Sequence, residues 1–409
     1  MTYSGAKERI WTRDLVFAWI VNFFLAFVFY MLMTTMALYA VERFSASDTL
    51  GGLASSIFVI GATISRLFAG NLVELFGRRR ILGIALVVFV LTSLSYLVID
   101  NIDSVALLLV VRAIHGAAFA IGSTAVMTLA QSIIPRSRRA EGTGYFTLSM
   151  TLATAIGPSL ALMLVHGPGY IWLFTATATA AVLAMAAALF LRAPDKTPSP
   201  EHRARLRRFH PSDMLHRDVV PVASFMLVLA VCYAGVLTFL NSYADERGLA
   251  TGASLFFLAY AITLFAARLI MGPLQDRRGD NLVVYISIAA FAVSLVMLGL
   301  ATTNVVLVLA GAFMGLGFGT LMSALQSIAV SRVPMPRMGL AISTHFFMLD
   351  LGIGLGPVLL GVLLNQLGYN QMYLVLAGVV VVSTGLYHLV HGRVERAEHE
   401  APVPVDATV

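Results

Sequence analysis

One carboxylate in this sequence lies where a charge is costly. Nearly all of the 21 Asp and Glu residues fall in short polar segments or at the ends of apolar runs, whereas Asp350 sits in the middle of one, in THFFMLDLG. A carboxyl group in an apolar medium takes up a proton more readily than in water, so Asp350 could load and release a proton. It could also hold a cationic ligand, or pair with an arginine such as Arg112.

Arg112 is the second candidate for chemistry. It lies about nine residues inside an apolar run, roughly 13 Å along a helix, where a guanidinium needs a partner or water. His115 follows at i+3 and would share its face, although a buried histidine is often simply hydrogen-bonded. His345 precedes Asp350 by five residues, about 140° around a helix, so the two are expected on different faces.

A set of polar side chains on the first and seventh apolar runs extends these candidates. Together with His115 and His345 they are predicted to line a substrate cavity, while each one alone is explained as readily by hydrogen bonding between helices. These residues are Asn22, Tyr30, Thr34, Tyr233 and Asn241.

The elements that carry these residues follow from composition. Of the 409 residues, 59% are hydrophobic and 12% are charged, against roughly 25% charged residues in a soluble domain. A soluble globule of this composition would leave too much apolar surface in water, which excludes soluble enzymes and disordered chains. A single cysteine, Cys232, excludes a disulfide framework or a cysteine-based metal site, and no metal site or phosphate-binding loop is predicted.

Twelve apolar runs are long enough to span a bilayer, at about 20 residues each. They are 14–41, 48–74, 79–99, 104–133, 141–166, 169–191, 218–244, 251–275, 282–301, 304–331, 338–366 and 368–390. The first run is too long for a cleavable signal peptide. The sequence therefore predicts an all-α integral membrane protein with 12 transmembrane helices.

The basic residues predict how these helices are oriented. Twenty-two of the 27 Lys and Arg residues fall on one side of the predicted membrane and two on the other. This asymmetry predicts that both termini and the basic, proline-containing segment 192–217 are cytoplasmic, in what is expected to be a bacterial inner membrane. The predicted domains are 1–191 and 218–390, each a six-helix bundle, joined by the linker 192–217 and followed by a tail at 391–409. The positive charge thus reports topology and predicts no nucleic-acid partner.

The two predicted bundles repeat each other in sequence. YAVER at 39–43 returns as YADER at 243–247, RLFAG at 66–70 as RLIMG at 268–272, and QSI at 131–133 as QSI at 326–328. Because six spans is an even number, equivalent helices run in the same direction. This predicts two bundles related by a pseudo-twofold axis along the membrane normal, an arrangement suited to rocking about a central site.

The segment between the second and third runs resembles a motif of the major facilitator superfamily, Gly-x-Leu-x-Asp-[Arg/Lys]-x-Gly-[Arg/Lys]-[Arg/Lys]. Here it reads GNLVELFGRR at 70–79, with Glu74 in place of Asp and Leu75 in place of the first base; the second half has GPLQDRRG at 272–279. A carboxylate at a helix end can bind arginines and helix N-termini, which would hold one conformation. The resemblance implies a gating role for Gly70, Glu74, Gly77, Arg78, Arg79, Gly272, Asp276, Arg277 and Gly279.

Two further segments resemble the same superfamily. RAIHGAAFA at 112–120 resembles the motif in which an arginine is associated with proton coupling or substrate binding, which implies such a role for Arg112. Gly157-Pro158 and Gly356-Pro357 resemble the helix-packing motif of the drug-efflux antiporters, with some glycines replaced by alanine. Small residues four apart allow close helix approach and proline bends a helix, so packing alone explains these residues.

These observations together predict a secondary transporter that works by alternating access. Proton-coupled efflux of a small organic solute, with Asp350 and Arg112 coupling the proton, is the favoured hypothesis; a symporter importing a nutrient or metabolite is the alternative. The expected partners are a small-molecule substrate, protons and the lipid bilayer. The proton gradient would be the energy source without a cofactor, and the protein is expected to function as a monomer and not to be an enzyme.

Overall fold

The computed structural model describes residues 9–99, 101–102, 104–192 and 214–393, and all regular secondary structure in this part of the chain is helical. The first half forms α1 (Arg13–Phe44), α2 (Asp48–Phe76), α3 (Arg78–Ile99), α4 (Val105–Ile133), α5 (Arg139–His166) and α6 (Tyr170–Leu189). The second half forms α8 (Val220–Glu246), α9 (Ala250–Arg278), α10 (Asp280–Gly299), α11 (Asn304–Met314), α12 (Thr320–Ser331) and α13 (Met338–Tyr387). Most of the predicted linker, 193–213, and the tail from 394 onward lie outside the described residues.

The twelve predicted spans are present once two irregularities are taken into account. A π-helical turn, Gly315–Gly319, joins α11 to α12, so that the two form one span. The long helix α13 is broken at Gly368, whose φ of 75° belongs to the left-handed region that glycine adopts without strain. The break divides α13 into the two predicted spans, 338–366 and 368–390, of which the second continues into a π-helical turn, His388–Gly392.

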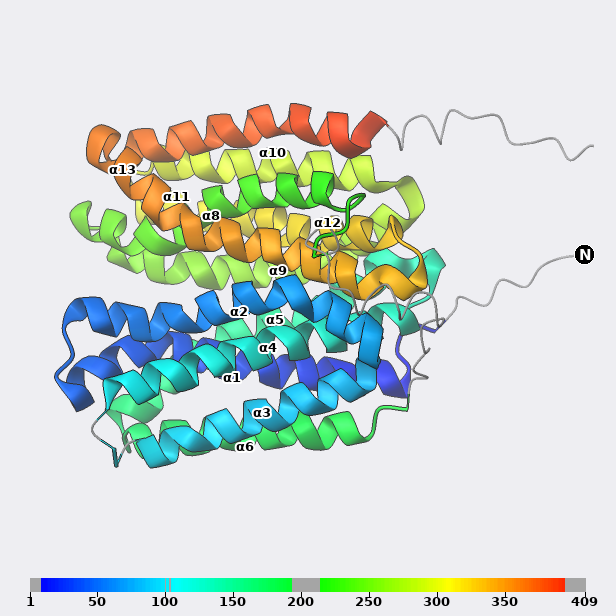
Figure 1. The fold of residues 1–409 in the computed structure, drawn as a ribbon. Coiled ribbons are helices and arrows are strands. Elements are labelled where there is room, and N and C mark those ends of the chain that lie inside the picture. The colour runs from blue at the N-terminus through cyan, green and yellow to red at the C-terminus, as the bar shows by residue number, and fades with distance from the viewer. Residues whose placement is uncertain (1–8, 100, 103, 193–213, 394–409) are drawn as a thin grey trace, which may run out of the picture.

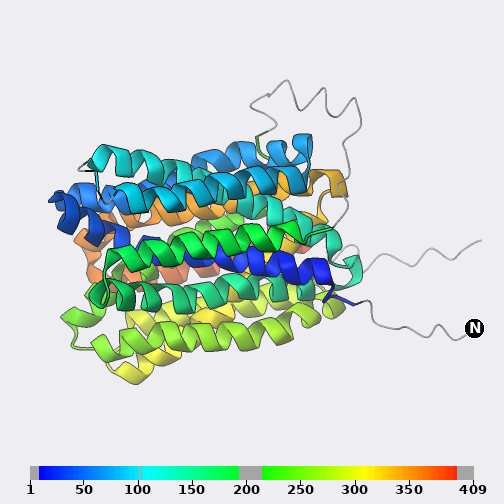
Figure 2. The ribbon, with the colours of Figure 1, turned by 90° about the horizontal axis from the view of Figure 1, so that it is seen from below.

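The helices pack as two bundles side by side (Figure 1). α1–α6 pack mainly with one another, as do α8–α13, and the bundles meet where α2 packs on α13 and α5 on α9. In the view from below the helices again run nearly parallel, with the first bundle in front of the second (Figure 2). The starts of α1 and α8 and the end of α6 lie at one end of the bundles, which we call the linker side; the other end is the opposite side.

Large apolar side chains cover the outer surfaces of both bundles. Val382 is 76% exposed, Leu189 74% and Val358 70%. A soluble monomer rarely carries contiguous exposed apolar surface on this scale, whereas hydrocarbon chains are its natural solvent. The exposed side chains thus agree with the apolar composition in making this an integral membrane protein.

Small residues allow close helix packing within each bundle. Gly157 in α5 lies against α1, where an added Cβ would come 3.0 Å from the Cβ of Tyr30. Gly356 in α13 lies against α8, and an added Cβ there would come 2.4 Å from the Cβ of Ala234. Pro158 and Pro357 follow these glycines inside their helices. Both glycine–proline pairs are therefore placed where a packing role requires them.

The α8–α13 contact predicts unequal effects of two neighbouring substitutions. Gly356→Ala should lower the melting temperature of the purified protein, because overpacking a tight contact costs about 1–3 kcal/mol. Gly354→Ala, two residues away, is the matched control: an added Cβ there meets nothing within 4 Å, and alanine favours helix. Equal melting temperatures for the two variants would contradict the tight α8–α13 contact.

Candidate functional site at the interface of the two bundles

Glycines bring the two bundles together on the linker side. Gly70 of α2 faces α13, and an added Cβ would lie 2.6 Å from the Cα of Leu340. Gly272 of α9 faces α5, and an added Cβ would lie 2.8 Å from the Cα of Glu141. Side chains larger than hydrogen would force the backbones apart at both places. These two positions, equivalent in the repeat, thus set the closest approach of the bundles.

One turn beyond each glycine, a carboxylate crosses to the N-terminus of a helix in the other bundle. Glu74 accepts a hydrogen bond from the backbone N–H of Leu340 at 3.0 Å, and Asp276 accepts two, from Ala140 and Glu141, both at 2.8 Å. The free N–H groups and dipole of a helix N-terminus favour a negative charge. The acids of the sequence motif therefore hold α13 and α5, respectively, against the opposite bundle.

The arginines around these acids break the symmetry. Arg337 pairs with Glu74 at 3.3 Å, but its equivalent, Arg138, pairs with Glu141 of its own bundle at 2.6 Å. Arg78 donates to the carbonyl of Met335 across the interface, at 3.2 Å. The remaining predicted gating bases, Arg79 and Arg277, are exposed at their helix ends.

Gly77 and Gly279 end the helices that carry the two acids. Both adopt positive φ, 90° and 86°, in equivalent turns between α2 and α3 and between α9 and α10. A side chain at either position would strain the backbone. These turns orient the ends of α2 and α9, and with them Glu74 and Asp276, toward the neighbouring bundle.

Deeper in the membrane, Asp350 bridges the bundles by an ion pair. Its carboxylate lies 2.5 Å from Nε of Arg66 in α2, and the side chains of Asp350 and Arg66 are 19% and 5% exposed. Arg66 also lies over the ring of Phe346 at 4.9 Å and accepts, through its carbonyl oxygen, a hydrogen bond from Ser343. Both residues fall within predicted spans, 48–74 and 338–366, but the sequence did not show that α2 and α13 face each other.

This geometry corrects the alternative in which Asp350 pairs with Arg112. The Arg112 guanidinium donates instead to the carbonyls of Ala54 and Ser55 in α2, at 2.9 and 3.2 Å, and lies over Phe58. Arg66 takes the predicted place of Arg112 because α2, and not α4, carries the arginine that faces α13 at this depth. Arg112 thus joins α4 to α2 within one bundle.

His115 is likewise enclosed in the first bundle. Its ring nitrogens interact with the hydroxyls of Ser93 and Tyr96 at 3.3 and 3.0 Å, and its ring packs against Phe58 and Phe89. These contacts correspond to the simpler explanation for this residue, a hydrogen-bonded buried histidine. His345 is also fully buried, with its ring edge-on to Phe346.

The other predicted cavity residues divide into two groups. Asn22 donates to Ser149 at 2.7 Å and joins α1 to α5 as a helix–helix contact. Tyr30 and Tyr233 are partly buried, whereas Thr34 and Asn241 are exposed, ten and five residues before the ends of α1 and α8. The Thr34 hydroxyl donates to the carbonyl of Tyr30 within α1, at 2.9 Å. The bundles are thus joined on the linker side while polar groups are exposed on the opposite side.

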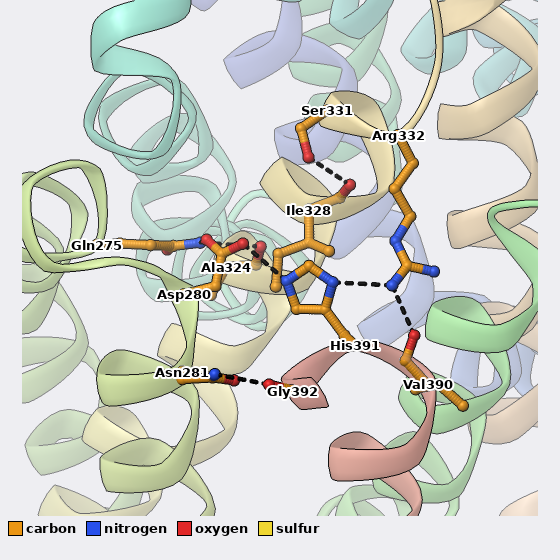
Figure 3. Close-up of polar contacts among 10 residues, drawn as sticks. All are labelled: Gln275, Asp280, Asn281, Ala324, Ile328, Ser331, Arg332, Val390, His391 and Gly392. Atoms are coloured by element: carbon orange, nitrogen blue, oxygen red, sulfur yellow. Dashed lines mark hydrogen bonds and ion pairs between the residues drawn. The ribbon is translucent and has the colours of Figure 1, made fainter. Parts of the chain in front are cut away.

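A second polar cluster, which sequence reasoning missed, lies at the linker end of the second bundle (Figure 3). His391 is placed between the Asp280 carboxylate, 2.9 Å from Nε2, and the Arg332 guanidinium, 2.8 Å from Nδ1. Arg332 also donates to the carbonyl of Val390 at 2.7 Å. Because these residues all belong to one bundle, the cluster ties α10, α12 and the end of the last span together and is no part of the interface. No sequence motif marks it.

Comparison with known proteins extends the structural result. The sequence profile of the Major Facilitator Superfamily matches residues 18–265 and again 250–407. The chain belongs to the major facilitator superfamily. The superfamily resemblance of the motifs is therefore confirmed, and the two overlapping matches agree with the internal repeat.

Individual relatives are transporters of the same superfamily. The chain is 25% identical over 348 residues to the MFS-type transporter YhhS of Shigella flexneri, covering 81% of each chain, and 22% identical over 355 residues to the staphylopine export protein of Staphylococcus aureus, covering 82% of this chain and 86% of that protein. The crystal structure of the human organic anion transporter MFSD10 superposes with a TM-score of 0.75 at 15% identity, covering 91% of this chain and 98% of that one. The predicted fold of this superfamily member is confirmed.

If the two acid–helix contacts hold the bundles of this superfamily member together on the linker side, weakening one of them should separate the bundles there. Replacing Asp276 with Asn should separate the bundles on the linker side, because a charge-assisted hydrogen bond is about twice as strong as a neutral one. Spin labels at Arg80 and Arg278, both exposed, would report the separation in a Cys232→Ser background that has no other cysteine. The distance distribution should shift toward longer values.

Glu246→Gln is the control for this measurement, since Glu246 is an exposed acid at the opposite end of α8. Its distance distribution should match that of the labelled parent. Identical distributions for Asp276→Asn and the parent would remove the gating role of Asp276.

Proposed function

We propose that this protein exports a small organic solute in exchange for protons, with the Asp350–Arg66 ion pair as the coupling element. The observation that carries the proposal is the position of this pair: it joins α2 to α13, and so the two bundles, at a depth where no other acid lies among the described residues. Export is further supported by similarity to the staphylopine export protein.

The ion pair links the charge of Asp350 to the conformation of the protein. When Asp350 is ionised, its attraction to Arg66 adds to the linker-side contacts and holds the bundles together there. Protonation of Asp350 removes that attraction and leaves the buried Arg66 guanidinium without a negative partner. An uncompensated charge in a medium of low polarity destabilises the closed arrangement. Protonation thus favours separation of α2 from α13 on the linker side.

With the linker side in the cytoplasm, as the distribution of basic residues predicts, an arrangement joined on that side would face outward. From this state Asp350, whose side chain is 19% exposed, takes a proton from outside. The bundles then open to the cytoplasm, the proton leaves, and the solute binds. Re-formation of the Asp350–Arg66 pair closes the cytoplasmic side and carries the solute outward. Flux in the reverse sense would make the same machinery a symporter.

The remaining expectations complete the proposal. The protein would lie in a bacterial inner membrane with both termini cytoplasmic, and a monomer contains both bundles needed for the pathway. Its energy would come from the proton gradient, with no cofactor or catalytic step. Asp350 and Arg66 would carry the coupling, in place of the predicted Asp350 and Arg112.

A flux measurement in proteoliposomes tests the coupling role of Asp350. An imposed proton gradient should drive solute flux by the parent protein, and Asp350→Asn should reduce gradient-driven flux by about tenfold or more, because the side chain no longer changes charge. Solute exchange at equal pH on both sides should be less affected. Gradient-driven flux at the parent rate in Asp350→Asn would exclude Asp350 as the proton carrier.

Asp245→Asn provides the control, since Asp245 is an exposed acid near the end of α8. Its gradient-driven flux should equal that of the parent. The direction of flux decides between the two transport modes: movement against the proton flow indicates exchange, and movement with it indicates symport.

A further inference from the structure

The repeat places a second arginine, Arg268, in the position equivalent to Arg66. RLFAG at 66–70 corresponds to RLIMG at 268–272, so Arg268 of α9 meets α5 as Arg66 of α2 meets α13. Arg268 is 1% exposed. A buried guanidinium in a membrane requires compensation by an opposite charge or by hydrogen-bond acceptors.

In α5, the helix that Arg268 faces, no acid occupies the position equivalent to Asp350. The position in α5 equivalent to Asp350 is Thr151, and the one acid in the sequence of α5 is Glu141, which pairs with Arg138. Arg268 donates through Nη1 to the carbonyl of Gly144 at 3.2 Å, while Nε and Nη2 have no hydrogen-bond partner among the described residues. Two adjacent N–H groups of one planar guanidinium are therefore unsatisfied, and together they form the edge that matches a carboxylate.

Tyrosine hydroxyls lie between this arginine and Asp350. Tyr260, two turns from Arg268 on α9, is within electrostatic range of the guanidinium. The Tyr260 hydroxyl interacts with that of Tyr233 of α8. Tyr30 of α1 lies within electrostatic range of both tyrosines and of Asp350. All three tyrosines are partly buried. The three hydroxyls thus extend from the neighbourhood of Arg268 to that of Asp350.

We propose that Arg268 binds the carboxylate of the transported solute, which makes the substrate a small organic acid or zwitterion. This inference rests on the proposed transport function and names its substrate class. The solute would supply the negative charge that no acid of the described residues provides to Arg268. The hydroxyls of Tyr260 and Tyr233 would donate to the same anion or to its polar neighbours.

The one hydrogen bond that Arg268 makes among the described residues also relates binding to conformation. Gly144 belongs to the other bundle, so opening the linker side would break the Nη1 contact and leave the whole guanidinium without a partner. An anion would then be bound most strongly in the state that is open to the cytoplasm. Such a preference suits a protein that collects its solute on that side.

Thermal unfolding of the purified full-length protein tests the proposal without a gradient. The probes are three carboxylates and their uncharged amides: benzoate and benzamide, nicotinate and nicotinamide, succinate and succinamide. At saturating concentration at least one carboxylate should raise the Tm by about 2 °C or more, and its amide should not. Arg268→Gln should abolish this difference, and its own Tm without ligand should equal or exceed that of the parent, because an uncompensated charge has been removed.

Two further variants keep the test decisive. Arg332→Gln is the control, since Arg332 has its partners in the cluster at the end of the second bundle, and it should keep the full carboxylate response. Arg268→Lys retains the charge but not the planar fork and should respond more weakly than the parent at the same concentration.

The proposal is overturned if no carboxylate stabilises the parent over its amide. It is equally overturned if Arg268→Gln or Arg268→Lys keeps the full response; a lowered Tm of Arg268→Gln combined with an intact response would identify Arg268 as purely structural. Because binding is measured at equilibrium, a failure of proton coupling leaves this result unaffected, and the two proposals fail independently.

Discussion

The high cost of charge in a bilayer organises this protein. A charged side chain in the hydrocarbon region is tolerated when a partner lies within reach, and here several of the essential partners belong to the other bundle. Asp350 meets Arg66, Glu74 meets the N-terminus of α13, and Asp276 meets the N-terminus of α5. The same interactions that make these charges tolerable therefore decide how the two halves of the molecule sit against each other.

The repeat uses this constraint twice, with differences that matter. At the linker end each half places a carboxylate at the N-terminus of a helix of the other bundle, and each has a glycine that lets the backbones approach. At mid-membrane depth one arginine has an acid and the other has one backbone carbonyl. Structural symmetry thus supplies two interface contacts of similar geometry, while chemical asymmetry leaves one intramembrane arginine paired with an acid and the other with a backbone carbonyl, the difference on which both proposals rest.

Polar residues inside one bundle have a different role from those between bundles. Arg112 and His115 are as buried as Arg268, yet their partners are carbonyls and hydroxyls of their own bundle. The cluster around His391 is similar, at the linker end of the second bundle. A rocking motion that keeps each bundle intact would leave these contacts unchanged. Position relative to the interface, and not burial or charge, therefore separates the structural groups from the candidates for mechanism.

The spans, the orientation, the repeat and the acids of the motif could be predicted from the sequence, because each depends on composition or on residues close together in the chain. Apolar run length set the spans, the distribution of arginines predicts orientation, and the repeat was legible in short strings such as RLFAG and RLIMG. Glu74 and Asp276 were identifiable because a carboxylate, a glycine turn and basic residues follow one another within a few positions. The π-helical turn at Gly315–Gly319 had no such signal.

The pairing of distant charges required the folded chain. Asp350, Arg112 and Arg66 were all recognisable as intramembrane charges, but a linear sequence does not state which helix faces which. Packing places α2 against α13 and so gives Asp350 to Arg66, 284 residues away, while the same packing turns Arg112 toward the carbonyls of α2. The isolation of Arg268 is also a tertiary fact, because it depends on what α5 lacks at the point of contact. Local chemistry thus selected the candidates, and long-range helix contacts assigned their partners.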